Sequence, residues 1–310
     1  MKNGKSFGHE ADSSLMAGGE LHMPNLKQVS DLHIYETDPP NEEHIDGLLA
    51  GRPLVREPFA EQVSKSLHVV TLNKIIESKR SAHGVGFGSL KFIGETALGG
   101  KEGGAGSVAV ALKPFNDPET AMQEMYGYVA LKALGVETFD PIGVFPAAHG
   151  EHYIMISEKR NDLLSLDRDK WIPGGYVVDE ETAATAKRNA VIVGDIADML
   201  GYIHVNGVYH PDGQIKNWAR TPEGEIGVID TENLRKEDIG HSDSVSLAWN
   251  DIEKLTKSLI LLSSDEELEN DDATVDKIYG VGMFAGLPTA QARKQIESLI
   301  IQPYLESLGL

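Results

Sequence analysis

The spacing of apolar residues changes along the chain, from short runs in the first half to a helical period in the second. Short apolar and β-branched runs between turn-forming residues are typical of strands, and they predict strands over residues 90–93, 107–112, 142–144 and 153–157. Apolar residues that recur every three to four positions are typical of amphipathic helices. They predict helices over residues 59–80, 117–134, 180–206, 245–262 and 290–307. This order of elements predicts an α+β fold.

The N-terminal part lacks such regularity. Residues 1–57 are rich in Gly, Pro, Asn and acidic residues, and Asp38-Pro-Pro-Asn-Glu-Glu43 has the composition of a linker. Segments with few apolar residues bury too little surface to offset the entropy of ordering. We therefore expect residues 1–57 to form an N-terminal extension that is disordered or draped over the folded domain.

Composition narrows the classes of partner and of chemistry. Forty-eight acidic residues against 28 basic ones give a formal charge of −20, which disfavours capture of nucleic acid or of an anionic membrane. This charge is compatible with a cationic small molecule or a basic protein segment as partner.

The chain has no cysteine, which excludes disulfides, thiolate metal sites and cysteine nucleophiles. No stretch reaches the ~18 apolar residues of a membrane span and no signal peptide is evident, so we expect a cytoplasmic protein.

The candidate chemistry lies in two nearby segments, His210-Pro-Asp-Gly-Gln-Ile-Lys-Asn217 and Val228-Ile-Asp-Thr-Glu232. Asp212 and Asn217 are five residues apart, and Asp230 follows Asn217 by thirteen, after an apolar run. Turn chemistry alone would account for Asp and Asn in a loop. It does not account for a third polar residue at the end of a strand. One carboxylate for a substrate hydroxyl, with an amide and a second carboxylate for Mg²⁺, is the set that phosphoryl transfer needs.

The local order also matters. An amphipathic helix over 192–204 ends at Asn206-Gly207, and a short extended piece leads into the loop. A turn over 221–224 and a strand over 225–229 then deliver Asp230. With this context the spacing resembles the catalytic core of the protein-kinase-like superfamily, in the looser form of aminoglycoside and other small-molecule phosphotransferases.

The resemblance implies a role for each residue of the loop. Asp212 would accept or orient the proton of the attacking hydroxyl, while Asn217 and Asp230 would bind the Mg²⁺ that bridges the phosphates of ATP. His210 would brace the loop. The implied fold has two lobes, a strand-rich one over 58–157 and a helical one over 158–310, with ATP and Mg²⁺ in the cleft between them.

The same resemblance implies nucleotide-binding residues in the first half. Lys113, at the end of the strand Val-Ala-Val-Ala-Leu-Lys, would grip the α- and β-phosphates of ATP. Glu124 in the following helix would pair with it, in preference to Glu119. The strand Tyr153-Ile-Met-Ile-Ser-Glu158 would enter the hinge, where backbone groups near Glu158 would bind adenine.

Two glycine-rich stretches compete for the loop that covers the phosphates. Gly84, Gly86 and Gly88 precede the strand at 90–93, whereas residues 103–106 adjoin the strand that carries Lys113. We favour Gly84, Gly86 and Gly88, because this order suits a glycine-rich loop between two strands. A P-loop over 94–101 is excluded, since Glu102 stands where a Ser or Thr must reach Mg²⁺.

Departures from the family pattern shape the functional expectation. His-Pro-Asp replaces His-Gly-Asp or His-Arg-Asp, and Asp230-Thr-Glu232 replaces Asp-Phe-Gly, which argues against a regulated activation loop. We expect an ATP- and Mg²⁺-dependent kinase that moves the γ-phosphoryl group to a hydroxyl of a cationic small molecule or a protein. Two alternatives stay open: a catalytically silent, nucleotide-binding pseudokinase-type regulator, and transfer of AMP on the same fold.

Overall fold

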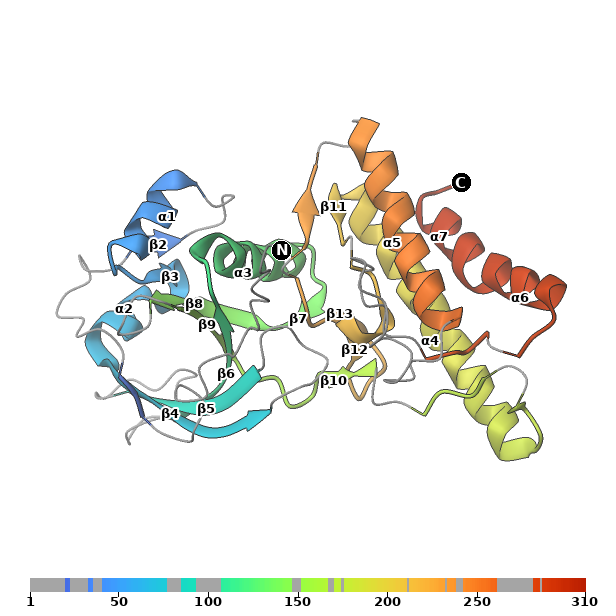
Figure 1. The fold of residues 1–310 in the computed structure, drawn as a ribbon, viewed down its shortest axis with the longest axis horizontal. Coiled ribbons are helices and arrows are strands. Elements are labelled where there is room, and N and C mark those ends of the chain that lie inside the picture. The colour runs from blue at the N-terminus through green and yellow to red at the C-terminus, as the bar shows by residue number, and fades with distance from the viewer. Residues whose placement is uncertain are drawn as a thin grey trace, which may run out of the picture. The chain divides into compact units, whose positions relative to one another are not determined.

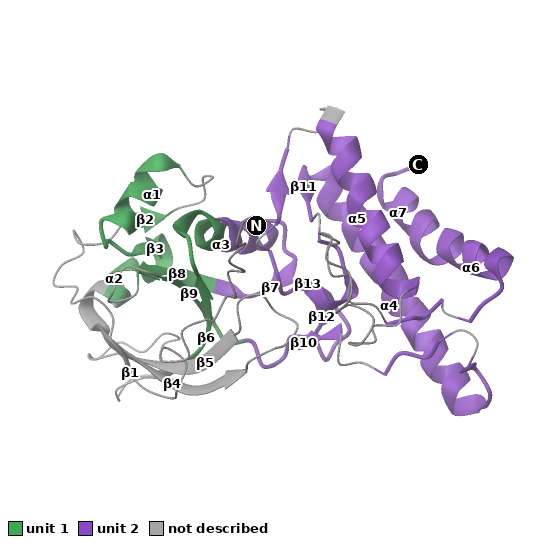
Figure 2. Cartoon of the chain, in the orientation of Figure 1, with its two compact units in different colours: residues 1–122, 141–159 green, residues 123–140, 160–310 purple. Residues whose placement is uncertain are grey.

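The computed structural model describes residues 20–22, 33–35, 41–76, 85–92, 107–146, 152–166, 170–173, 176–210, 212–231, 233–237, 242–260, 281–284 and 286–310. The chain divides into two compact units (Figure 2). Unit 1 comprises residues 1–122 and 141–159, and unit 2 comprises residues 123–140 and 160–310. Strands and helices are mixed along the chain, so the predicted α+β class is confirmed. The lobe boundaries at 58–157 and 158–310 stay a prediction.

Unit 1 is organised around a sheet whose described strands run in the order β1-β4-β5-β6-β9-β8-β3-β2 (Figure 1). The strands are β1 (Glu20–His22), β2 (His33–Tyr35), β3 (Leu54–Arg56), β4 (Leu67–Ile76), β5 (Val85–Phe92), β6 (Ser107–Phe115), β8 (Asp140–Pro146) and β9 (Tyr153–Glu158). Its helices are α1 (Glu42–Leu49), α2 (Glu57–Ser66) and the first turn of α3 (Pro118–Ala133). The strands predicted near 90, 107, 142 and 153 are confirmed.

The centre of this sheet is an antiparallel set of β5, β6 and β9. In the register of β6 with β9, Leu112 faces Ile156 and Lys113 faces Met155. Almost the whole of β9 is buried, as expected for a strand covered on both faces. The buried aliphatic side chains of β6 and β9, among them Val110, Leu112 and Ile156, thus form part of the interior of unit 1.

Two sequence predictions in unit 1 are wrong. The helix predicted over 59–80 ends with α2 at Ser66, and β4 takes over from Leu67. The Val69-Val70-Thr71 cluster favours a strand, and pairing with β5 along nearly the whole of β4 decides in its favour. The N-terminal extension is likewise not wholly outside the fold, because β3 pairs with β8 and buries Leu54 and Val55.

Helix α3 begins and ends where the sequence predicts. Asp117 accepts a hydrogen bond from the backbone N–H of Thr120 at 2.7 Å, which satisfies one of the free donors of the first turn. Gly135 has a φ of 76°, the left-handed conformation that ends helices and suits glycine. The helix from Gln123 onward belongs to unit 2.

Unit 2 is mainly helical, and its helices pack around one apolar core. The helices are α4 (Glu180–Val205), α5 (Ser242–Ile260), α6 (Thr289–Ile296) and α7 (Gln302–Ser307), with a π-helical turn over Glu297–Ile301. Small sheets complete it: β10 (Leu164–Ser165), β12 (Trp218–Arg220), β13 (Ile226–Val228) and β7 (Glu137–Thr138) form one, and β11 (Val208–Tyr209) with β14 (Arg235–Lys236) forms the other. Fully buried Leu200, Trp218 and Leu255 join α4, β12 and α5 in the core. The helices predicted near 180, 245 and 290 are confirmed.

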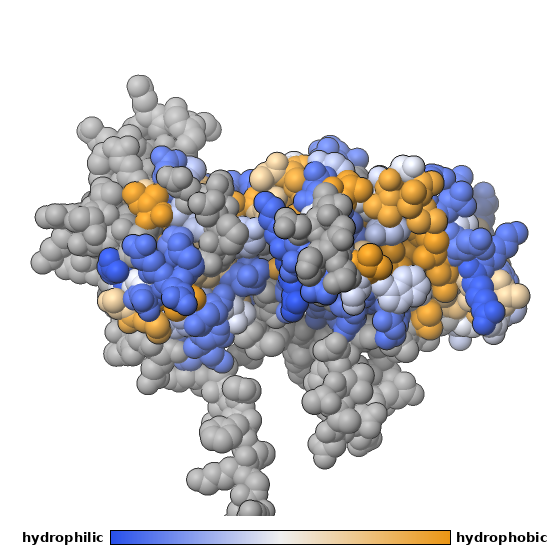
Figure 3. All heavy atoms as spheres, turned by 90° about the horizontal axis from the view of Figure 1, so that it is seen from above, coloured by the Kyte–Doolittle hydropathy of each residue, from blue (hydrophilic) through white to orange (hydrophobic). Residues whose placement is uncertain are grey.

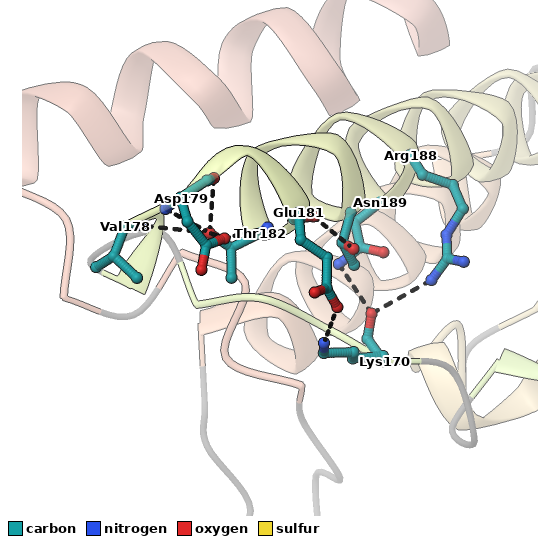
Figure 4. A network of polar contacts seen from close by, with 8 residues as sticks. Lys170, Val178, Asp179, Glu181, Thr182, Arg188 and Asn189 are labelled. Carbon is teal, nitrogen blue, oxygen red and sulfur yellow. Dashed lines mark hydrogen bonds and ion pairs between the residues drawn. The ribbon is translucent and has the colours of Figure 1, made fainter.

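The start of α4 is specified by its own side chains (Figure 4). Asp179 caps the helix, accepting from the backbone N–H of Thr182 at 2.8 Å, while the Thr182 hydroxyl accepts from the Asp179 N–H at 3.1 Å. Lys170 also contacts the helix: its ammonium lies 3.2 Å from Glu181 of the first turn, and its backbone carbonyl accepts a hydrogen bond from the Asn189 amide. A reciprocal cap of this kind is typical of helix N-termini.

The surface of the helices of unit 2 is mixed in polarity. Figure 3 shows apolar residues, in orange, gathered in patches among polar ones, and the exposed apolar side chains of these helices include Val245, Trp249 and Leu305. Exposed apolar residues are common on protein surfaces, so we assign no partner to them. No helix in the described part of the chain is long and apolar enough to cross a membrane.

Candidate active site

The candidate site is built on a loop between two short strands of unit 2. Helix α4 ends at Val205, and Gly207, with a φ of 73°, turns the chain into β11. After the loop, a 3₁₀ turn over Ile215–Asn217 leads into β12. A tight turn at Gly224, φ 99°, returns the chain through β13 toward Asp230. The helix, loop, hairpin and acid predicted from the sequence are all present.

Within the loop, Asp212 and Asn217 hydrogen-bond directly. The Asn217 amide nitrogen donates to the Asp212 carboxylate at 2.8 Å and to the Asp212 backbone carbonyl at 2.7 Å. The Gln214 amide donates to the other carboxylate oxygen, and the ammonium of Lys216 lies 4.0 Å from the carboxylate. The Asp212 side chain stays 22% exposed. Asp212 is thus held in one orientation while remaining accessible to a ligand.

The hairpin brings Asn217 and Asp230 to the same end. The backbone N–H of Ile229 donates to the carbonyl of Asn217 at 3.0 Å, and Trp218 faces Val228 in the register of β12 with β13. Asp230 therefore follows a residue bonded to Asn217. Because the Asn217 amide nitrogen is turned to Asp212, its oxygen is the atom that could face a cation.

These donors suit a hard divalent cation. An amide oxygen and a carboxylate are ligands that Mg²⁺ accepts, and Mg²⁺ is commonly held by one or two protein oxygens together with substrate phosphates. No group of three or more His, Cys, Asp or Glu residues able to hold a metal occurs among the described residues. One amide oxygen and one carboxylate therefore fit a hard cation that takes its remaining ligands from water or a substrate.

A buried polar network supports the loop from behind. Asp251 of α5, fully buried, accepts from the backbone N–H of His210 at 2.7 Å. The same carboxylate oxygen lies 2.8 Å from Nε2 of His204, whose Nδ1 lies 2.9 Å from the Tyr304 hydroxyl. In a neutral His204 ring, Nε2–H donates to Asp251 and Nδ1 accepts from Tyr304. Helices α4, α5 and α7 are therefore joined to the start of the loop.

The His210 ring lies buried at the start of the loop. It is buried, 6.0 Å from the Trp218 ring between centroids, and its two nitrogens have no hydrogen-bond partner among the described residues. Burial lowers the pKa of His210, and the opposing charges of Asp251, Asp212 and Asp230 do not outweigh it. The buried ring lies beside Trp218, and the bracing role expected from the sequence stays a prediction.

The network predicts a measurable role for the Tyr304 hydroxyl. Tyr304→Phe should lower the free energy of unfolding by about 1–3 kcal/mol, because Nδ1 of His204 would be buried without a donor. Burial raises the pKa of Tyr304 from 10.0 to about 12. The difference in the free energy of unfolding between wild type and Tyr304→Phe should therefore have its full size below pH 10 and become smaller as the pH rises toward 12.

Urea unfolding followed by tryptophan fluorescence measures this difference, since Trp171, Trp218 and Trp249 all lie in unit 2. Tyr202→Phe is the matched control, because the Tyr202 hydroxyl also makes one hydrogen bond, to the backbone carbonyl of Leu134 at 2.9 Å, but the Tyr202 side chain is exposed. Equal losses in the two variants would contradict the role of the network.

Glu124 also reaches this region. It is fully buried in the part of α3 that belongs to unit 2, and its carboxylate accepts from the backbone N–H of Thr231 at 3.3 Å. Lys113 lies in unit 1, buried on β6, with its ammonium 5.4 Å from the centroid of the Phe115 ring. The ion pair expected between Lys113 and Glu124 stays a prediction.

Of the remaining predicted residues, Glu158, Gly86 and Gly88 lie in the sheet of unit 1. Glu158 ends β9 opposite Val110, and the N–H of Lys159 continues the pairing to Ala109 at 2.9 Å. Gly86 and Gly88 are wrongly predicted as part of a loop. Both lie inside β5, paired with β4 on one side and β6 on the other, because the strand starts earlier than the apolar run at 90–93 suggests. Gly84 and residues 103–106 lie outside the described residues.

The supporting residues His204, Gln214, Thr231, Asp251 and Tyr304 were not anticipated. Gln214 and Thr231 carry a local signal, since they lie within the two candidate segments. His204 lies in the preceding helix, and Asp251 and Tyr304 are distant in sequence. The described site is thus a bonded Asp212–Asn217 pair beside the hairpin end that carries Asp230. No known protein-family model matches this chain, and no curated protein sequence matches it.

Proposed function

We propose that this protein is an ATP- and Mg²⁺-dependent phosphotransferase with a protein-kinase-like, two-lobed fold, which moves the γ-phosphoryl group of ATP to a hydroxyl. The observation that carries the proposal is the hydrogen-bonded Asp212–Asn217 pair, joined by one β-hairpin to Asp230. Such a set offers one accessible carboxylate for the acceptor and two oxygen donors for the cation of the nucleotide.

The reaction assigns each residue of the loop a task. The acceptor oxygen attacks Pγ, the bond from Pγ to the bridging oxygen of ADP breaks, and the proton of the acceptor hydroxyl passes to Asp212. Bound Mg²⁺ would neutralise charge on the phosphates of ATP, with Asn217 and Asp230 as its protein ligands. The amides of Gln214 and Asn217 orient the Asp212 carboxylate, so that the hydroxyl meets it at a defined angle.

Lys216 adds a positive charge to the loop. Its ammonium lies 4.0 Å from the Asp212 carboxylate and is partly exposed. A cation at this distance stabilises negative charge on a phosphoryl group brought next to Asp212. From unit 1, Lys113 would bind the α- and β-phosphates, and backbone groups near Glu158 would bind adenine.

The acceptor is a cationic small molecule or a protein hydroxyl. The formal charge of −20 favours approach of a positively charged acceptor, because a strong net charge raises the local concentration of opposite charges. Fold alone does not name the acceptor, so the identification depends on the labelled product.

The test uses ATP labelled at either the γ- or the α-phosphate. We expect label from γ-labelled ATP, and none from α-labelled ATP, to appear in an acceptor when the purified protein is incubated with amino-sugars or with a lysate. Transfer of the α-label would establish AMP transfer instead. Nucleotide binding without transfer of either label would establish a regulator, and absence of nucleotide binding would refute the proposal.

A further inference from the structure

The part of α3 in unit 2 is bonded to the chain on both sides of Asp230. The Tyr128 hydroxyl donates to the carbonyl of Ile229 at 2.9 Å, just before Asp230. The Gln123 amide donates to the carbonyl of Leu234, just after it. Two consecutive turns of one helix thus bracket the residue that carries the proposed cation ligand.

Thr231, the residue directly after Asp230, makes the closest of these connections. Its hydroxyl donates to the backbone carbonyl of Glu124 at 2.7 Å, and its N–H donates to the Glu124 carboxylate at 3.3 Å. Thr231 and Glu124 are both fully buried. Because buried polar groups are costly to leave unpaired, these two bonds resist any rotation of the backbone next to Asp230.

The packing around Thr231 leaves no room for movement toward the helix. A Cβ atom placed on Gly127 would lie 2.6 Å from the Cβ and 2.9 Å from the carbonyl oxygen of Thr231. Such distances are far below van der Waals contact, so glycine is required for this close approach. The helix backbone itself is the surface on which Thr231 rests.

We infer that Thr231 is a positioning residue, which latches the segment of Asp230 to α3 and holds the Asp230 carboxylate ready to bind a cation. The identity of that cation as Mg²⁺ on a nucleotide rests on the proposed function. The latch is formed by hydrogen bonds and packing within unit 2.

Thr231→Val removes the hydroxyl and keeps the branched shape, whereas Thr231→Ser keeps the hydroxyl. We expect Val to weaken binding of Mg²⁺, titrated with a non-hydrolysable ATP analogue by calorimetry, by about tenfold, the equivalent of one buried hydrogen bond. Ser should stay within about twofold of wild type. Should Val fail to fold, Thr231→Ala removes the same hydroxyl without adding volume.

Thr138→Val is the matched control. Thr138 is also buried, and its hydroxyl donates to the carbonyl of Val228 at 2.6 Å, two residues before Asp230, so it leaves the bonds of Thr231 itself intact. We expect this variant to lose stability yet to bind Mg²⁺ with the analogue as wild type does. An equal loss of Mg²⁺ binding in the Thr138 and Thr231 variants would overturn the latch, because it would show that any destabilisation of unit 2 weakens Mg²⁺ binding.

Amide hydrogen exchange separates the latch from the proposed function. Residues 229–234 should exchange faster in Thr231→Val than in wild type and in Thr138→Val, whether or not nucleotide is present. Unchanged exchange in folded Thr231→Val would overturn the latch. A wild-type chain that binds no nucleotide with Mg²⁺ would instead overturn the proposed function.

Discussion

Replacing Asp212 with asparagine is expected to lower phosphoryl transfer by at least ~10²-fold, the lower end of general-base contributions. The substitution keeps the size of the side chain and removes its charge and basicity. ATP affinity should change little, because Asp212 is expected to meet the acceptor hydroxyl rather than the nucleotide. Calorimetry of ATP binding and a rate assay of phosphate transfer measure the two quantities.

The neighbours of Asp212 dictate the control. Its two carboxylate oxygens each accept from an amide, that of Gln214 or that of Asn217, and an asparagine can accept at only one of them. Gln214→Leu removes one of these bonds while leaving the carboxylate in place, and it should reduce turnover far less than Asp212→Asn. If Asp212→Asn retains near-normal turnover, Asp212 is a turn residue and the proposed function loses its main support.

Removing the cation or its carboxylate ligand should abolish transfer. We expect turnover to require Mg²⁺ or Mn²⁺ and to vanish with EDTA, because the oxygen donors of Asn217 and Asp230 suit hard ions. Asp230→Asn should cripple turnover, by a factor of at least ~10², since charge neutralisation is a main term in phosphoryl transfer. Its effect on binding of metal-free ATP should be much smaller.

Asp179→Asn serves as the control for this substitution. Asp179 caps α4 outside the loop, and asparagine is an equally good capping residue, so turnover should be unchanged. Turnover that persists in EDTA would contradict the cation site as described. Equal loss of metal-free and Mg²⁺-dependent nucleotide binding in Asp230→Asn would point to a folding defect, which thermal unfolding of the variant would reveal.

The local sequence predicted most of the helices and strands and the order of the candidate site residues along the chain. Strand composition predicted β6 and β9, and Asn206-Gly207 was predicted to end the helix that the structure ends at Val205. Loop residues five positions apart, Asp212 and Asn217, were predicted to act together and are hydrogen-bonded. These features depend on backbone propensities and on contacts between near neighbours, which a single sequence records directly.

Long-range pairing decided what the local pattern could not. The segment after Ser66 became a strand, and Gly86 joined a strand rather than a loop, because hydrogen bonds to neighbouring strands outweighed the local preference. Residues 54–56, which were expected outside the domain, form β3 and pair with β8. Such pairing energies arise only when distant segments meet, so no local window contains them.

The support of the candidate site was likewise a matter of tertiary structure. Tyr304 lies 100 positions from His204, and Thr231 lies 107 from Glu124. The residue types alone do not identify these pairs. A buried polar side chain needs a hydrogen-bond partner, but the sequence does not show which distant residue provides it. The sequence by itself therefore determined which groups carry the proposed chemistry. The tertiary structure decided what holds them, because a buried hydrogen bond needs both partners in place.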